Sequence, residues 1–127
     1  MKELPAELEG TFDLVVGPEH TAEALGNEGM RVFGTPYVVW MVECAAYTAT
    51  AAYLEPGEGI AGTHINLHHR APTAIGHPVH AVARLVGRHG RRLRYEATVT
   101  ADDQVIADGV YESAVVDMER MRARISQ

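Results

Sequence analysis

The segment that most constrains this chain is "TPYVVWMVECAAYTATAAY", residues 35–53, its most apolar stretch. Thr35-Pro36 is a strong helix start, because Thr suits the N-cap and Pro suits the first helical position. The helix is predicted to run to about Leu54 and to end at "EPGEG", since a Pro-Gly pair cannot continue it. Apolar side chains cover every face of this helix, so other elements must enclose it.

After the helix the sequence changes to a strand pattern. The next segments, "GTHINLHHRAP", "HPVHAVARLVGRHG", "RRLRYEATVTADD" and "QVIADGVYESAVVDM", are four β-type runs with hairpin-like turns at His89-Gly90 and Asp102-Asp103. "GTFDLVVGPEH", residues 10–20, reads as a first strand, residues 18–34 as a loop with a helical turn, and "ERMRARIS" as a short basic amphipathic tail. One antiparallel five-stranded sheet curled around a long central helix accounts for this order. The sequence therefore predicts an α+β protein with the hot-dog fold.

Composition limits the class of protein. With 127 residues and no Ser/Gly-rich or Pro-rich linker, residues 1–127 are most simply one domain. A net charge of −6 argues against a nucleic-acid partner, which needs a broad basic surface. The single cysteine, Cys44, excludes an internal disulfide and suits a reducing compartment. Neither a signal peptide nor a run of roughly 20 apolar residues is present, so we expect a cytoplasmic protein without a membrane partner.

Glu43 is the one carboxylate within the apolar helix. Burying an ionised carboxylate is costly unless it is paired or its pKa rises. Its helical neighbours Val39, Trp40, Ala46 and Tyr47 offer no cation. A structural ion pair or a side chain that reaches solvent is the alternative, but the pattern favours a functional carboxylate.

His69 and Thr35 are the other candidates. Strand alternation in "HINLHHR" puts His69 on the same face as Ile65 and Leu67, toward the helix. A core histidine is the plain alternative, yet a carboxylate on the enclosed helix would give an acid/base pair with it. Thr35 has a strong alternative as an ordinary N-cap.

These residues belong to a longer pattern. The run "TPYVVWMVECAAYTATAAYLEPGEGIAGTHINLHHRAPTAIGHPV", followed by "GRRLRYEATVTADDQVIADG", resembles the hot-dog acyl-CoA thioesterases of the fluoroacetyl-CoA thioesterase type, from about Thr35 to Val116. Its most specific parts are a Thr eight residues before a helix Glu, the "YLEPGEG" turn, the "GT" that opens the next strand, and a His seven residues after that Gly. The resemblance implies Thr35, Glu43 and His69 as catalytic positions and Gly62 near the thioester carbonyl. It also implies an acyl-CoA substrate and no separate cofactor, since coenzyme A is part of the substrate.

The chain departs from that family pattern at two positions. The fluoroacetyl enzyme has a bulky aromatic gate before its catalytic Thr, and the matching place here is Gly29. An Arg in its "GTHER" segment is matched by Ser113 in "GVYES". We therefore expect a small acyl-CoA substrate without a strong preference for the fluorinated one.

The spacing of Thr35 and Glu43 bears on assembly. Eight residues at 1.5 Å rise place them roughly 12 Å apart on a straight helix, beyond hydrogen-bond reach. If both serve one site, the site is shared between two subunits. Proteins of the resembled fold do pair in this way, so we expect a homodimer, and two such dimers could pair into a dimer of dimers.

Other functions stay open at this stage. One alternative is a non-catalytic module that binds acyl-CoA or another small ligand on the same fold. A His-rich metal-binding domain is another, but in a strand His64 and His68 stand roughly 13 Å apart and cannot share an ion, so no metal is expected. Four arginines around the His89-Gly90 turn are either solvated or in contact with the phosphates of coenzyme A: Arg88, Arg91, Arg92 and Arg94.

Overall fold

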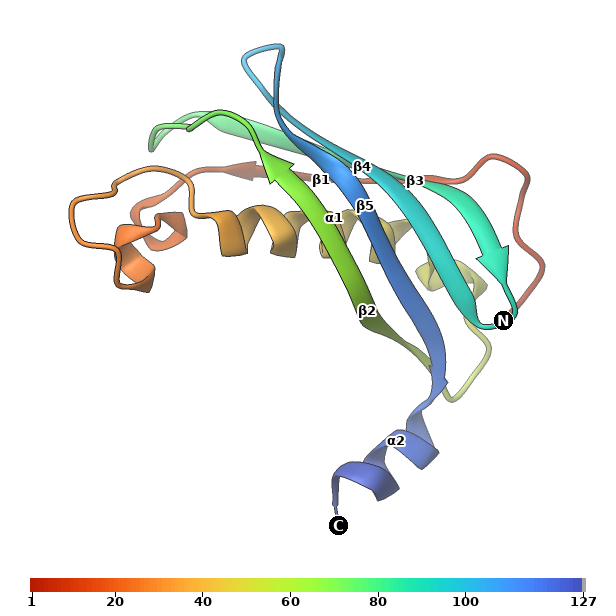
Figure 1. The fold of residues 1–127 in the computed structure, drawn as a ribbon. Coiled ribbons are helices and arrows are strands. Elements are labelled where there is room, and N and C mark those ends of the chain that lie inside the picture. The colour runs from red at the N-terminus through yellow and green to blue at the C-terminus, as the bar shows by residue number, and fades with distance from the viewer. Residues whose placement is uncertain (127) are drawn as a thin grey trace.

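A computed structural model describes residues 1–126, so the last residue of the predicted domain, 127, lies outside the described part (Figure 1). Three short 3-10 turns, at Pro18–His20, Glu23–Leu25 and Ala51–Tyr53, accompany the main elements. Those elements are, in chain order, β1 (Glu9–Val15), α1 (Thr35–Thr50), β2 (Glu58–His69), β3 (Pro78–His89), β4 (Arg92–Ala101), β5 (Gln104–Asp117) and α2 (Met118–Ile125). The predicted order of one strand, a long helix and four strands is confirmed.

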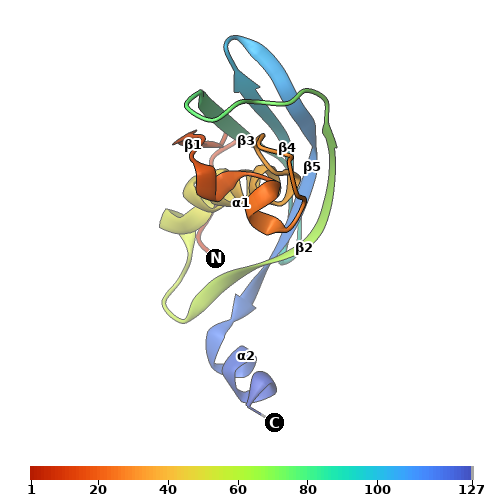
Figure 2. The same ribbon diagram turned by 90° about the vertical axis from the view of Figure 1, so that its left-hand side faces the viewer.

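The five strands form one antiparallel sheet in the order β1-β3-β4-β5-β2. Seen from the side, the sheet curls and holds α1 against its concave face, which is the hot-dog architecture (Figure 2). The two predicted hairpin turns are present, and their residues Gly90, Asp102 and Asp103 have φ of 61°, 51° and 63°. These left-handed conformations suit two-residue turns between antiparallel strands.

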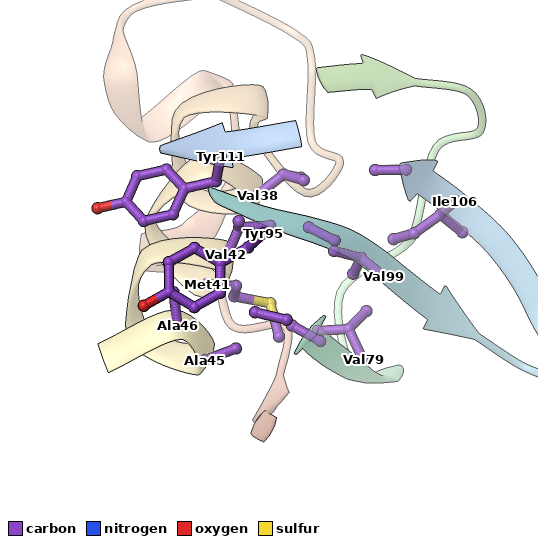
Figure 3. Close-up of a cluster of buried hydrophobic side chains, with 14 of the residues drawn as sticks. Val38, Met41, Val42, Ala45, Ala46, Val79, Tyr95, Val99, Ile106 and Tyr111 are labelled. Carbon is purple, nitrogen blue, oxygen red and sulfur yellow. The ribbon is translucent and has the colours of Figure 1, made fainter. Parts of the chain in front are cut away.

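The core lies between α1 and the concave face of the sheet (Figure 3). Small side chains on the helix let the backbones approach closely: Gly10 of β1 lies so near the Ala45 carbonyl that a Cβ would clash with it. The fully buried residues of α1 come from one face of the helix and are Val38, Met41, Val42, Ala45, Ala46, Ala49 and Thr50. They meet the inward side chains of β3, β4 and β5, which include Val79, Tyr95, Val99, Ile106 and Tyr111.

The opposite face of α1 is exposed, which corrects the expectation of an enclosed helix. Trp40 and Tyr47 are 42% and 53% exposed, and Glu43 between them is also exposed. The physical reason is geometric, because one five-stranded sheet covers only one side of a helix. The chain therefore presents an apolar face that is left uncovered within residues 1–126.

Two further features stand at the margin of the fold. β2 is an edge strand, paired only with β5 among the described residues, and its Ile65 is 38% exposed. The helix α2 projects away from the body at the end of β5 (Figures 1 and 2). No helix within residues 1–126 is long and apolar enough to span a membrane.

Candidate active site

Thr35 and His69 meet directly. The Thr35 Oγ1 and the His69 Nδ1 lie 2.7 Å apart, which joins the start of α1 to the end of β2. The N-cap of α1 is Gly34, and no side chain caps the helix, so the expectation of Thr35 as N-cap is wrong by one residue. Thr35 is the first helical residue, and its hydroxyl is free to bond the histidine ring instead of the helix backbone.

His69 faces α1, as the strand alternation predicted. Its Nδ1 bonds Thr35, whereas its Nε2 is buried and has no partner among residues 1–126. Burial lowers the pKa of His69, so the ring is neutral at pH 7. A buried ring nitrogen without a partner is unusual in a folded protein, which makes this side of His69 a candidate for contact with a ligand.

A cavity of about 280 Å³ opens beside this pair. Thr35 and His69 line it together with the loop that precedes α1 and the segment that follows β2; the other lining residues are Ala22, Asn27, Met30, Val32, Phe33, Arg70, Ala71 and Pro72. Most of these side chains are apolar. Arg70 is engaged with Asp108 through its guanidinium, at 2.8 Å from Nη2 to Oδ1. The cavity therefore presents an apolar wall beside the threonine and the histidine.

Glu43 lies in a different place. Since α1 is continuous from Thr35 to Thr50, the rise of the helix puts Glu43 roughly 12 Å along the axis from Thr35. Its side chain is exposed, beside Trp40 and Tyr47. Within one chain the structure thus brings together two of the three predicted catalytic residues and leaves the carboxylate apart from them.

Gly62 lies on β2 beside a β-bulge, where the register with β5 shifts between Gly62 and His64. It is seven residues from His69, which is roughly 23 Å along an extended strand. A Cβ at Gly62 would lie 2.9 Å from the Tyr111 hydroxyl oxygen, so the glycine lets this phenol reach the strand backbone.

Sequence reasoning missed Tyr111. It is 4% exposed, and the charge of Glu43 is one of the causes that raise its pKa. The signal was the strand alternation of "VYES", which turns Tyr111 and Ser113 toward the helix. A second group of candidate residues therefore lies apart from Thr35 and His69. It consists of the backbone of Gly62 and the side chains of Glu43 and Tyr111.

The remaining candidates are accounted for more simply. His64 and His68 lie in β2 as a strand and are exposed, and among residues 1–126 no three His, Cys, Asp or Glu side chains are grouped to hold a metal ion. Burial, followed by the charge of Glu43, raises the pKa of Cys44, which keeps the thiol protonated. Of the four arginines around the His89-Gly90 turn, Arg94 donates a hydrogen bond to Glu112 at 2.8 Å and Arg91 donates one to the Val115 carbonyl.

The position that the resemblance matches to the aromatic gate, Gly29, is open here. Gly29 has φ of 83°, and nothing lies within 4 Å of the place where its Cβ would be. A large side chain at this position would need a left-handed backbone and would point into open space. The loop before α1 therefore carries no aromatic gate at residue 29.

Comparison with known proteins identifies the family of the chain. The family model described as fluoroacetyl-CoA-specific thioesterase matches residues 16–119. The chain belongs to this family. The fluoroacetyl-CoA thioesterase of Streptantibioticus cattleyicolor is 37% identical over 123 residues, which cover 92% of this chain and 88% of that protein.

Solved structures support the same assignment. A structure of the fluoroacetyl-CoA thioesterase superposes with a TM-score of 0.94 at 34% identity, covering 99% of this chain and 98% of that one. A thioesterase superfamily member from Thermus thermophilus gives a TM-score of 0.92 at 27% identity, covering 99% and 93% of the two chains. The fold is thus the hot-dog fold of a thioester hydrolase family, as the sequence resemblance implied.

Proposed function

We propose that this protein hydrolyses a small acyl-CoA thioester to the free acid and coenzyme A. The observation that carries the proposal is the 2.7 Å contact between Thr35 Oγ1 and His69 Nδ1, with the opposite ring nitrogen buried and unpartnered beside an apolar cavity. Such an arrangement holds a neutral imidazole in one orientation toward a ligand. The family membership and the 37% identity to a fluoroacetyl-CoA thioesterase support the same reaction.

The Glu43 carboxylate acts in the hydrolysis in one of two ways. As a general base it removes a proton from water, which then attacks the thioester carbonyl carbon. As a nucleophile it attacks that carbon itself, the C–S bond breaks and the coenzyme A thiolate leaves, and water hydrolyses the resulting transient anhydride in a second step. Both routes use the same carboxylate.

His69 and Thr35 position the reacting groups. With its pKa lowered by burial, His69 is a neutral donor and acceptor at pH 7 rather than a standing acid. The departing thiolate of coenzyme A needs little help from an acid, because thiol pKa values lie near 8.5. The Thr35 hydroxyl fixes the ring, and the Gly62 N–H helps to stabilise the oxyanion.

A homodimer is proposed because the two groups of polar residues lie apart in one chain. Residues 62 and 69 are equidistant from the midpoint between Ile65 and Asn66. If two β2 edges pair antiparallel about a two-fold axis at that midpoint, Gly62 of one subunit lies opposite His69 of the other. The free edge of β2 and the exposed Ile65 support this pairing. A dimer of dimers and a cytoplasmic location stay predictions.

The function is tested with a panel of short acyl-CoAs and a reagent that reports free thiol. Release of thiol with saturation kinetics for at least one short acyl-CoA is expected. Saturable binding without thiol release would favour the alternative, a non-catalytic acyl-CoA or small-ligand binding module.

A further inference from the structure

Tyr111 stands at the centre of the second polar group. Its ring comes from β5, next to Tyr95 of β4, with ring centroids 5.8 Å apart, and both hydroxyls lie at the same end of the buried cluster (Figure 3). The Tyr111 hydroxyl oxygen would be 2.9 Å from a Cβ at Gly62, and the ring carbon Cε1 would be 3.4 Å from it. The hydroxyl therefore lies against the strand backbone at the position implied for the thioester carbonyl.

The two neighbouring tyrosines differ in their hydrogen bonds. The Tyr95 hydroxyl donates to the Thr50 Oγ1 at 3.3 Å and is fully buried. The Tyr111 residue is 4% exposed, and among residues 1–126 no hydrogen bond of its hydroxyl to another side chain or to the backbone is found. The phenol oxygen is not among the buried polar atoms that lack a partner, so it stays accessible at the edge of the cluster, where its O–H can donate to a ligand.

The protonation state of Tyr111 is also clear. Burial, then the nearby Glu43 carboxylate and Tyr95, raise the pKa of Tyr111 to about 12. The phenol is therefore neutral near pH 7 and can act there as a hydrogen-bond donor.

We propose that the Tyr111 hydroxyl is a further catalytic group of this site, which donates a hydrogen bond to the thioester carbonyl oxygen beside Gly62 and to the oxyanion that forms from it. The inference rests on the proposed thioesterase function and adds a donor that the sequence did not suggest. The step is a hydrogen bond only, so the proton stays on the phenol oxygen throughout. Glu43 raises the pKa of this phenol and so helps to keep the donor protonated while the substrate oxygen becomes negative.

The test compares two identical chemical changes in adjacent tyrosines. Tyr111→Phe is expected to lower kcat roughly a hundredfold, the scale for one lost oxyanion donor, while KM for the same acyl-CoA changes little. Tyr95→Phe removes a hydroxyl that bonds Thr50 away from the reaction, so it lowers the melting temperature and leaves kcat near the wild-type value. Circular dichroism of both variants shows whether the fold is kept.

A double-mutant cycle with Gly62→Ala gives an independent reading. In the wild-type background the added Cβ meets the Tyr111 oxygen at 2.9 Å and displaces it, so kcat falls. In the Tyr111→Phe background that oxygen is gone, and the nearest ring carbon at 3.4 Å is close to ordinary contact. The loss caused by Gly62→Ala is therefore expected to be several-fold smaller there.

The outcomes separate this inference from the function on which it rests. If the wild type hydrolyses an acyl-CoA, Glu43→Gln does not, and Tyr111→Phe keeps a wild-type kcat, the inference is wrong and the thioesterase function stands. Equal losses for Tyr95→Phe and Tyr111→Phe would also overturn it, because they would indicate a packing effect. Absence of hydrolysis by the wild type across the panel would overturn both.

Discussion

Mixing inactive variants tests whether the site is shared between two subunits. Thr35 and Glu43 are roughly 12 Å apart along α1, whereas Thr35 and His69 are in contact at 2.7 Å in the same chain. In a shared site, one subunit supplies Thr35 and His69 and the other supplies Glu43. A heterodimer of Thr35→Ala and Glu43→Gln then carries one wild-type site and one doubly altered site.

The magnitude follows from random reassortment. Equal amounts of the two variants give about half heterodimers, and each heterodimer has one of its two sites intact, so the mixture recovers about a quarter of wild-type activity. Acyl-CoA hydrolysis is measured after dissociation and reassociation, with subunit exchange confirmed by native mass spectrometry of differently tagged chains.

The hydrogen bond between Thr35 and His69 supplies the matched control. Both residues belong to the same half of the site, so Thr35→Ala mixed with His69→Ala leaves every site defective and recovers nothing. His69→Ala mixed with Glu43→Gln, in contrast, recovers the same quarter. If exchange is complete and the mixture of Thr35→Ala with Glu43→Gln stays inactive, the shared site is refuted and all three residues act from one chain.

Three further predictions concern single sites. Glu43→Gln lowers hydrolysis at least about a hundredfold with the melting curve unchanged, whereas Glu119→Gln, which changes another exposed carboxylate on α2, has no effect. A near wild-type rate for Glu43→Gln would exclude a catalytic Glu43. The rates of hydrolysis of fluoroacetyl-CoA and acetyl-CoA are expected to differ little, because Gly29 offers no gate. A change of about one methylene between substrates in an apolar pocket is worth only ~1 to 3 kcal/mol. Rates that differ by several orders of magnitude would contradict this. The pKa of His69 is lowered, so the wild-type kcat/KM is expected to fall only as the pH drops through a value below about 6.5. A fall in kcat/KM that begins above that value would argue against a role for His69.

The same lowered pKa sets the sign of a stability effect. At a pH well above about 6.5 the histidine is neutral in both the folded and the unfolded chain, so it makes no difference to stability. Below that pH the unfolded chain takes up the proton first, because burial disfavours the charged ring in the folded chain. Stability therefore decreases as the pH falls below the ordinary histidine range, and His69→Ala reduces this dependence.

Local chemistry was enough to predict most of the fold. The Pro-Gly stop, the change from helical to alternating pattern, and the two short turns indicated α1, β2 and the hairpins. The bounds differ, because α1 ends at Thr50 before a 3-10 turn and β2 begins at Glu58, earlier than expected. The same alternation correctly turned His69 toward α1. The N-cap was misplaced by one residue, because Gly and Thr are both good caps and only the observed backbone distinguishes them. Tyr111 was missed because its register partners are Ile65 and Tyr95, and only the folded structure shows that its hydroxyl reaches Gly62.

The exposure of Glu43 shows where a single sequence stops being sufficient. A helix that is apolar on all sides is expected to be buried, but the pattern does not say whether its own chain or another subunit covers each face. Here the chain's own sheet covers one face, and Trp40, Glu43 and Tyr47 remain on the other. If the second face is covered by another subunit, the carboxylate becomes buried only on assembly, and its desolvation is then a property of the dimer. Catalysis and dimerisation should accordingly be lost together when the β2 edge is blocked, even though no catalytic side chain has been changed.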